Sequence, residues 1–189
     1  MAADVLIIYG TTHGHTAKIA AAMADALRGA GVGADVVNAT HWRQAPAPDA
    51  YRAVIVAASV VAGNYQRGVR RWVRAHAAAL RTRPSAFVSV CLGVLERKPA
   101  VDAQLAHVRQ RFFETTGWQP SETKVVAGSL PYTKYNWLTR RMMVTIVRKG
   151  SGDTDTSRDY EYTDWDDVHA FVRDFVQHAG VAPAVSAAP

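Results

Sequence analysis

Five short apolar segments alternate along the chain with stretches that have the periodicity of amphipathic helices. The apolar segments span 5–9, 34–38, 53–58, 86–92 and 124–130, and most of them are apolar throughout. Strands without polar alternation are typical of a sheet that helices cover on both faces. Regular alternation of such strands with helices favours parallel strands. The chain is therefore expected to be an α/β protein with a five-stranded parallel sheet.

Four helices are expected, each with an apolar stripe at helical spacing. The stripes comprise Ile19, Met23, Leu27 and Ala30; Val69, Trp72, Val73, His76 and Leu80; Val101, Leu105, Val108 and Phe112; and Val168, Phe171, Val172 and Phe175. The last helix is expected to begin at the sequence TDWDDV, with Thr163 as N-cap and Asp166 as its partner three residues on. His76 is expected to pack in the core.

The length and the hydrophobic content predict one domain. The chain has 189 residues, of which 49% are hydrophobic, and this suits one substantial core. We expect the domain to span 1–178 and the aperiodic segment 179–189 to be disordered. An insert at 131–162 separates the fifth strand from the last helix and is far longer than an ordinary connection. Its aromatic residues argue against disorder, and the sequence NWLTRRMMVTIVRK within it predicts a short helix.

Charge and cysteine content limit the class of protein. A net charge of +6 and a pI near 9.7 favour an anionic partner. The chain carries no recognised nucleic-acid-binding motif, so nucleic acid is not expected. The single cysteine, Cys91, lies in an apolar strand and is expected to be a small buried side chain in a reducing, cytoplasmic compartment. No metal cluster, membrane span or signal peptide is expected.

The sequence GTTHGHT, residues 10–16, joins the first strand directly to the first helix. In a parallel α/β sheet this loop lies at the carboxyl edge, where ligands bind at the switch in strand order. Its backbone N–H groups and the hydroxyls of Thr11, Thr12 and Thr16 suit a phosphate. The loop has neither the G-x-G-x-x-G pattern nor the lysine P-loop pattern. The alternative is a capped turn without a ligand.

The same loop resembles the T-x-T-G-x-T type motif with which flavodoxin-like proteins hold the 5′-phosphate of FMN, with Thr11, Gly14 and Thr16 in place. The resemblance is closer to one branch, the menaquinone-dependent protoporphyrinogen IX oxidases of bacterial haem synthesis. It extends over nearly the whole chain, through PSAFVSV at 84–90, RKP at 97–99, GSLPYTKYNW at 128–137, TDT at 154–156 and YTDW at 162–165.

This resemblance implies a flavodoxin-like three-layer sandwich with strand order 2-1-3-4-5, and FMN as cofactor. It implies electron transfer from the porphyrinogen to a quinone at the cytoplasmic face of a membrane. The cofactor-binding residues it implies are Thr11, Thr12, His13, Gly14, His15, Thr16, Ser59, Val60, Val61, Ala62, Gly63, Asn64, Tyr65, Leu92, Gly93, Val94, Leu95 and Glu96. The substrate-binding residues it implies are Arg97, Lys98, Tyr132, Lys134, Tyr135 and Trp137. It assigns no catalytic residue.

The chain departs from that family in the loop after the third strand. The family has an arginine and an aromatic residue there, in a sequence of the type S-I-R-Y-G-H-Y, where this chain has Val61 and Ala62. The change removes a cationic partner for a propionate. We expect Arg97 and Lys98 of the neighbouring loop to supply that charge instead.

Two other functions remain open from the sequence. The first is a flavodoxin-type electron carrier between protein partners. The second is a flavin-dependent quinone reductase with a nicotinamide donor. Flavodoxins are generally acidic, and a simple carrier has no use for the insert 131–162. The insert's basic residues Arg140, Arg141, Arg148 and Lys149 lie near Tyr135 and Trp137 in sequence. Such a combination favours binding to an anionic membrane surface. The sequence makes no prediction of oligomeric state.

Overall fold

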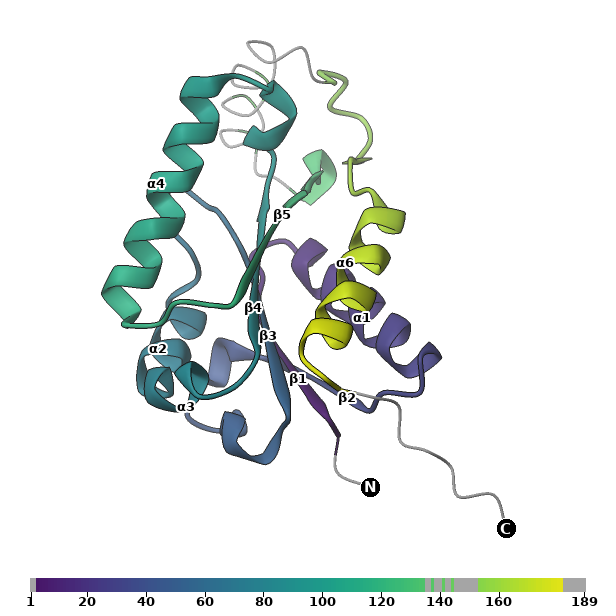
Figure 1. Cartoon of the computed structure of the whole chain (residues 1–189). Coiled ribbons are helices and arrows are strands. Elements are labelled where there is room, and N and C mark those ends of the chain that lie inside the picture. The colour runs from purple at the N-terminus through teal and green to yellow at the C-terminus, as the bar shows by residue number, and fades with distance from the viewer. Residues whose placement is uncertain (1–2, 135–136, 138–140, 142–143, 145–152, 182–189) are drawn as a thin grey trace.

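The computed structural model describes residues 3–134, 137, 141, 144 and 153–181. Its central layer is a five-stranded parallel sheet in the order β2-β1-β3-β4-β5, which confirms the predicted fold class (Figure 1). The strands are β1 (Val5–Gly10), β2 (Ala34–Asn38), β3 (Ala53–Ser59), β4 (Ser85–Cys91) and β5 (Glu122–Ala127). The first four agree with the sequence prediction to within one residue at each end.

Helices cover both faces of the sheet (Figure 1). On one face lie α1 (His15–Gly29) and α6 (Trp165–His178), and on the other lie α2 (Arg67–Ala75), α3 (Ala77–Arg81) and α4 (Pro99–Thr116). Each face has its own buried cluster, so that Ile7 packs with Met23 while Ile8 packs with Trp72. Side chains alternate across a strand, and two covered faces therefore require strands that are apolar throughout. No helix in the described part of the chain is long and apolar enough to cross a membrane.

Short 3-10 turns complete the connections between these elements. They are η1 (Ala39–His41), η2 (Pro48–Ala50), η3 (Gly93–Glu96) and η4 (Tyr132–Lys134). The turn η1 lies directly under α2, because a Cβ atom at Gly68 would be 2.1 Å from the carbonyl oxygen of Ala39. Only glycine permits this approach, which places the start of α2 close to the carboxyl edge of the sheet.

The apolar stripe over 69–80 forms two helices instead of the predicted one. The two helices, α2 and α3, meet at His76, whose backbone has φ −112° and ψ 13°. The prediction of a core position for His76 is also corrected, because the residue is only half-buried and its ring lies 4.9 Å from that of Trp72. Burial lowers the pKa of His76.

The fifth strand ends at Ala127, three residues before its predicted end at 130. A separate antiparallel hairpin follows, in which β6 (Ser129–Leu130) pairs with β7 (Tyr160–Glu161). The change of direction occurs at Gly128, whose N–H donates to the carbonyl oxygen of Cys91 at 3.3 Å. The hairpin therefore holds both ends of the insert at the carboxyl edge of the sheet.

Two predictions for irregular segments are tested in part. Of the helix predicted within 136–149, the structure describes Trp137, Arg141 and Val144, all of them helical; the remaining positions lie outside the described residues. The segment 179–189 was expected to be disordered, but Val181 is buried and its N–H donates to the carbonyl oxygen of Val176 at 3.0 Å. Residues 182–189 lie outside the described residues.

Candidate functional site

A cavity of about 530 Å³ opens at the carboxyl edge of the sheet, and we call it the main cavity. The loops after β1, β3, β4 and β5 all contribute to its lining, which is mostly apolar. It lies at the switch in strand order, because β1 pairs with β2 on one side and with β3 on the other. Open α/β sheets bind ligands at this place.

The loop between β1 and α1 is shaped by two glycines. A Cβ atom at Gly10 would lie 2.6 Å from Cγ2 of Val69, so only glycine allows β1 to end against α2. Gly14 has φ +93° at the N-cap of α1, and its N–H donates to Oγ1 of Thr11 at 2.9 Å. No side chain caps α1. The first-turn amides therefore have no side-chain acceptor at the positive end of the helix.

Thr16 is the second residue of α1 and lines the main cavity. The residue is only 1% exposed, yet its Oγ1 has no hydrogen-bond partner. A buried hydroxyl without a partner is rare and costs about 1–3 kcal/mol. An anion at the start of α1 would accept this hydrogen bond and those of the neighbouring amides. The residues present thus fit a phosphate group.

Part of the predicted cofactor-binding set lies together in the lining of the main cavity. These residues are Thr11, His13, His15, Thr16, Ser59, Val60, Val61, Ala62, Leu92 and Gly93. Val60 and Val61 from the β3 loop and Leu92 from the β4 loop supply apolar walls, which suit a flat aromatic ring. Cys91 also borders the cavity, and burial raises the pKa of its thiol. It acts as a small apolar side chain, as predicted.

The β3 loop ends in a tight turn that turns Gly63 away from the main cavity. Val61 and Asn64 exchange two backbone hydrogen bonds of 2.8 and 3.0 Å. Between them Ala62 and Gly63 have φ 48° and 70°, as in a two-residue hairpin turn with both central residues left-handed. The carbonyl oxygen of Gly63 accepts a hydrogen bond from Arg111 of α4 at 2.8 Å. Gly63 and Asn64 do not line the main cavity.

Tyr65 is a core residue and not a wall of the main cavity. It is 6% exposed, and its ring packs edge-on against Phe87 and Phe112 with centroids 5.1 and 5.0 Å away. Its hydroxyl lies 2.8 Å from Oγ of Ser89. The ring therefore packs in the aromatic cluster between the sheet and α4, and the cofactor contact implied for Tyr65 stays a prediction.

The rest of the β4 loop also lies outside the lining of the main cavity. Val94, Leu95 and Glu96 belong to the turn η3. Glu96 pairs with Lys98 at 3.2 Å, and Arg97 has a left-handed backbone with φ 47°. Both basic residues are exposed. The cations that were expected to meet a propionate therefore do not reach the cavity wall.

The insert meets the main cavity through Pro131 and not through the next residue, Tyr132. Tyr132 is fully buried, its hydroxyl donates to the carbonyl oxygen of Asp153 at 2.9 Å, and its ring lies 6.2 Å from that of Tyr160. The substrate contact implied for Tyr132 stays a prediction. Its ring anchors the insert internally.

The other predicted substrate residues of the insert have different surroundings. Lys134 lies over the loop 10–16, which we call the phosphate loop, with Nζ 3.5 Å from the carbonyl oxygen of His13. Trp137 is 76% exposed. Tyr135 lies outside the described residues. Burial and the charge of Lys134 both lower the pKa of His13, burial being the larger cause.

His15 connects the phosphate loop to the last helix. Its Nε2 lies 2.6 Å from Oγ1 of Thr163, whose hydroxyl donates to the carbonyl oxygen of Ala127 at 2.8 Å. Thr163 is thus not the N-cap of α6. That position belongs to Asp164, whose carboxylate accepts from the N–H of Asp167 at 3.0 Å. Burial lowers the pKa of His15.

Glu161 of β7 forms a second connection between the insert and α1. Its carboxylate accepts from Nζ of Lys18 at 2.7 Å and from Nε1 of Trp165 at 3.0 Å. The hydrogen bond from Lys18 is the main reason why the pKa of Glu161 is lowered. The hairpin, α1 and α6 therefore meet beside the phosphate loop.

A family model described as a flavodoxin domain matches residues 6–157. Protoporphyrinogen IX dehydrogenase (quinone) of Escherichia coli K12 is 36% identical over 170 residues, which cover 89% of this chain and 92% of that protein. The chain belongs to this flavodoxin-domain family. The protein of the same name from Leishmania major is 33% identical over 175 residues, covering 90% of this chain and 73% of that protein. A flavodoxin domain implies that a flavin binds.

Solved structures of flavodoxins show the fold of the family. Oxidised flavodoxin 2 of Bacillus cereus matches with a TM-score of 0.56 and 11% identity, covering 93% of this chain and 99% of that protein. Oxidised flavodoxin 1 of the same organism matches with a TM-score of 0.54 and 14% identity, covering 93% and 98%. At these identities the likeness shows the fold alone.

Sequence reasoning did not identify Gln66, which links two loops of this flavodoxin domain. Its Nε2 donates to Oγ of Ser59 at 2.6 Å and to Oγ1 of Thr12 at 3.2 Å, and its Oε1 accepts from the N–H of Ser59 at 3.2 Å. Gln66 lies immediately before α2 and belongs to no recognisable sequence motif. Only its place beside both loops reveals the role.

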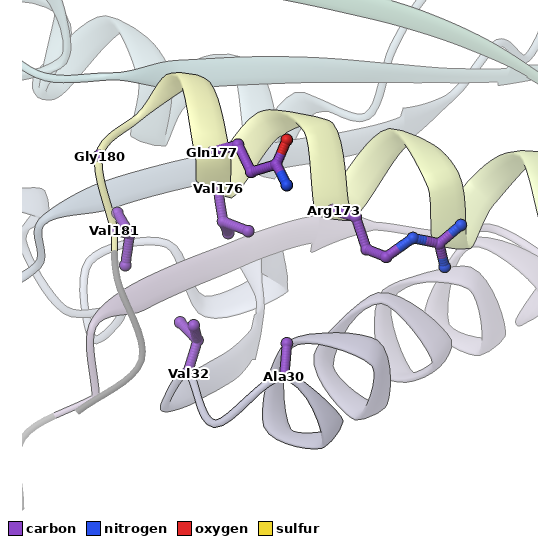
Figure 2. A pocket seen from close by; sticks show the side chains of 7 residues that line it. All are labelled: Ala30, Val32, Arg173, Val176, Gln177, Gly180 and Val181. Atoms are coloured by element: carbon purple, nitrogen blue, oxygen red, sulfur yellow. The ribbon is translucent and has the colours of Figure 1, made fainter. Parts of the chain in front are cut away.

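Another cavity, of about 460 Å³, lies between the ends of α1 and α6 (Figure 2). Val32 and Val176 point into it, and Arg173 is the one charged residue of its lining. It has none of the polar loops that surround the main cavity. The main cavity is therefore the candidate functional site.

Proposed function

We propose that this chain binds FMN in the main cavity and oxidises protoporphyrinogen IX, passing the electrons through the flavin to a quinone in haem synthesis. The relatives from E. coli and L. major carry this activity in their names, and both matches extend over about nine tenths of this chain. The observation that carries the cofactor assignment is the buried, unpaired hydroxyl of Thr16 at the uncapped start of α1.

The binding mode follows from the lining of the main cavity. Thr11, Thr16 and the first-turn amides of α1 would hold the phosphate, and Val60, Val61 and Leu92 would flank the ring system. Bound FMN supplies the redox chemistry, accepting electrons from the substrate and donating them to the quinone. The chain orients the ring and excludes water from it with apolar side chains. This role requires no acid and base pair.

The insert 131–162 is proposed as the wall on the substrate side. It begins and ends on the hairpin β6–β7, and Ser129 and Pro131 line the main cavity. Its exposed Trp137, together with Tyr135, would contact an apolar substrate or quinone. Its basic residues, among them Arg140 and Arg141, would hold the protein on an anionic membrane surface, where quinones reside.

An electron carrier is the second candidate, because the flavodoxin-domain model matches residues 6–157 of this chain. A carrier would reduce or oxidise protein partners and would need no substrate wall. The net charge of +6 and the insert distinguish this chain from a typical carrier. The two functions predict different results in one experiment.

The experiment is anaerobic oxidation of protoporphyrinogen IX with a menaquinone analogue by the FMN-loaded protein. A matched variant has residues 131–157 replaced by a short Gly/Ser loop. We expect quinone-dependent porphyrin formation by the wild type, and its loss in the variant while FMN remains bound. An FMN-loaded wild type that accepts electrons from a reductase but does not oxidise the porphyrinogen would establish the carrier instead. A wild type that binds no FMN contradicts both candidates.

A further inference from the structure

A polar cavity of about 380 Å³ adjoins the main cavity, and we call it the side cavity. Thr12 of the phosphate loop, Val61 of the β3 loop, and Arg67 and Arg70 of α2 are among its lining residues. Val61 lines both cavities, so the β3 loop stands between them. A ligand at the mouth of the main cavity that extends past Val61 therefore lies beside the two arginines.

The positive charge of the side cavity is not neutralised within the described part of the chain. Arg67 and Arg70 form no ion pair there, and no Asp or Glu is among the residues that line the cavity. Arg83, by contrast, forms an ion pair with Asp49, with Nη2 3.1 Å from Oδ1. An adjoining hollow of about 200 Å³ shares Arg70 and adds Arg111. Three guanidinium groups thus surround the turn of the β3 loop.

The rim of the side cavity is held in place before any ligand binds. Gln66 links Thr12 to Ser59, and Arg111 donates to the carbonyl oxygen of Gly63 at 2.8 Å and to Oδ1 of Asn64 at 3.2 Å. A preorganised site loses less conformational freedom when its ligand binds. Val61 is 44% exposed and forms an apolar ridge between the two cavities.

We propose that the side cavity binds the carboxylates of a substrate whose apolar body lies against the bound flavin at the mouth of the main cavity. The inference rests on the proposed function, in which the substrate is a tetrapyrrole with two propionates. Guanidinium groups bind carboxylates through paired, charge-assisted hydrogen bonds. Arg67 and Arg70 line a cavity that adjoins the main cavity, whereas Arg97 and Lys98 are not among the lining residues of either cavity. The macrocycle crosses the apolar ridge of Val61.

Helix α2 offers a matched control for this assignment. Arg71 and Arg74 lie on the same helix and are exposed, but they line neither the main cavity nor the side cavity. Replacing this pair removes the same amount of charge within about a turn of the proposed site. A general attraction of anions by the basic surface would respond equally to both pairs.

The experiment measures equilibrium binding of protoporphyrin IX and of its uncharged dimethyl ester to the FMN-loaded protein, by porphyrin fluorescence. The double variant R67Q/R70Q is compared with R71Q/R74Q, with FMN content and thermal unfolding as checks of the fold. We expect R67Q/R70Q to weaken binding of the free acid by about tenfold or more and to leave the ester unchanged. R71Q/R74Q should bind both porphyrins like the wild type.

Three outcomes overturn the assignment. They are unchanged binding of the free acid to R67Q/R70Q, equal weakening by both double variants, and equal loss of the acid and the ester. If the wild type also oxidises protoporphyrinogen IX, any of these outcomes contradicts the carboxylate-binding role of the side cavity but not the proposed function. A wild type that neither binds the porphyrins nor oxidises protoporphyrinogen IX removes the proposed function itself.

Discussion

The imidazole Nε2 of His15 lies 2.6 Å from the hydroxyl oxygen of Thr163, 148 residues further along the chain. The one proton of that hydroxyl goes to the carbonyl oxygen of Ala127 at 2.8 Å, so Nε2 of His15 must donate. This hydrogen-bond chain connects the start of α1, the end of β5 and the start of α6. The phosphate loop and the insert therefore share one support.

Removing the hydroxyl of Thr163 should destabilise the fold. Thr163→Val leaves the partly buried N–H of His15 and the carbonyl of Ala127 without their partner, and each such loss costs about 1–3 kcal/mol. We expect urea unfolding to show a drop of about 2 kcal/mol in the free energy of unfolding. Thr163→Ser keeps the hydroxyl and should lose much less. Equal losses in the two variants would contradict this assignment.

The stability of the FMN-free protein should fall as the solution becomes mildly acidic. Burial lowers the pKa of His15 below its ordinary value of 6.5, so the unfolded chain binds a proton at a higher pH than the folded chain. The free energy of unfolding then decreases as the pH drops below 6.5. The lowered pKa of Glu161 acts only in stronger acid, below its ordinary value of 4.5.

His15→Gln isolates this histidine's share of the pH dependence. Urea unfolding of the FMN-free protein at about pH 7 and pH 5.5 should show a smaller decrease for the variant than for the wild type. Some decrease should remain, because burial also lowers the pKa values of His13 and His76. His41→Gln, a change at an exposed position, serves as the control. An unaltered pH dependence in His15→Gln would exclude His15 as a contributor.

Thr16→Val should have opposite effects on stability and on cofactor binding. Because Oγ1 of Thr16 is buried without a partner, an apolar group of similar shape should leave the FMN-free protein equally stable or about 1 kcal/mol more stable. FMN binding should weaken by about 1–3 kcal/mol, since a hydrogen bond to a charged phosphate is lost. Riboflavin, which has no phosphate, should bind both forms alike. Equal loss of riboflavin and FMN would refute the phosphate assignment.

Charge reversal in the insert should release the protein from anionic vesicles. Each basic residue near such a surface contributes about 1 kcal/mol at low salt, so Arg140→Glu with Arg141→Glu should abolish most of the binding. Co-sedimentation with vesicles containing anionic lipid measures the effect. Arg71→Glu with Arg74→Glu reverses the same charge on α2 and should bind more strongly than the insert variant. Equal binding of the two variants would contradict a specific role for the insert.

The fold class and four of the strands could be predicted because the information is local. A strand buried on both faces is apolar nearly throughout, and β1, β3 and β4 carry that signal, whereas the edge strand β2, with Asp35 and Asn38, carries it more weakly. The end of β5 could not be predicted. Ser129 and Leu130 continue the sequence pattern of the strand, but they pair with β7, about 30 residues away. Pairing over such a distance leaves no periodic mark on the sequence.

The same limit applies to the candidate site. The phosphate loop was recognisable because its glycines and threonines lie within seven consecutive residues, 10–16, and Thr11 and Thr16 do line the main cavity. Tyr65 and Tyr132 were assigned to the site through the resemblance, and the sequence alone does not distinguish an aromatic side chain in a cavity wall from one in a core. The structure places both in packed interiors.

The sequence by itself determined the α/β class, the strand and helix alternation and the glycine- and threonine-rich loop 10–16, because each depends on residues close together in the chain. Only the tertiary structure decided which side chains surround that loop. Gln66, Arg67 and Arg70 reach it because α2 packs on η1 through Gly68, and Thr163 reaches it because α6 returns beside α1. These contacts depend on how distant elements pack, and packing is specified by the whole core and not by any short pattern.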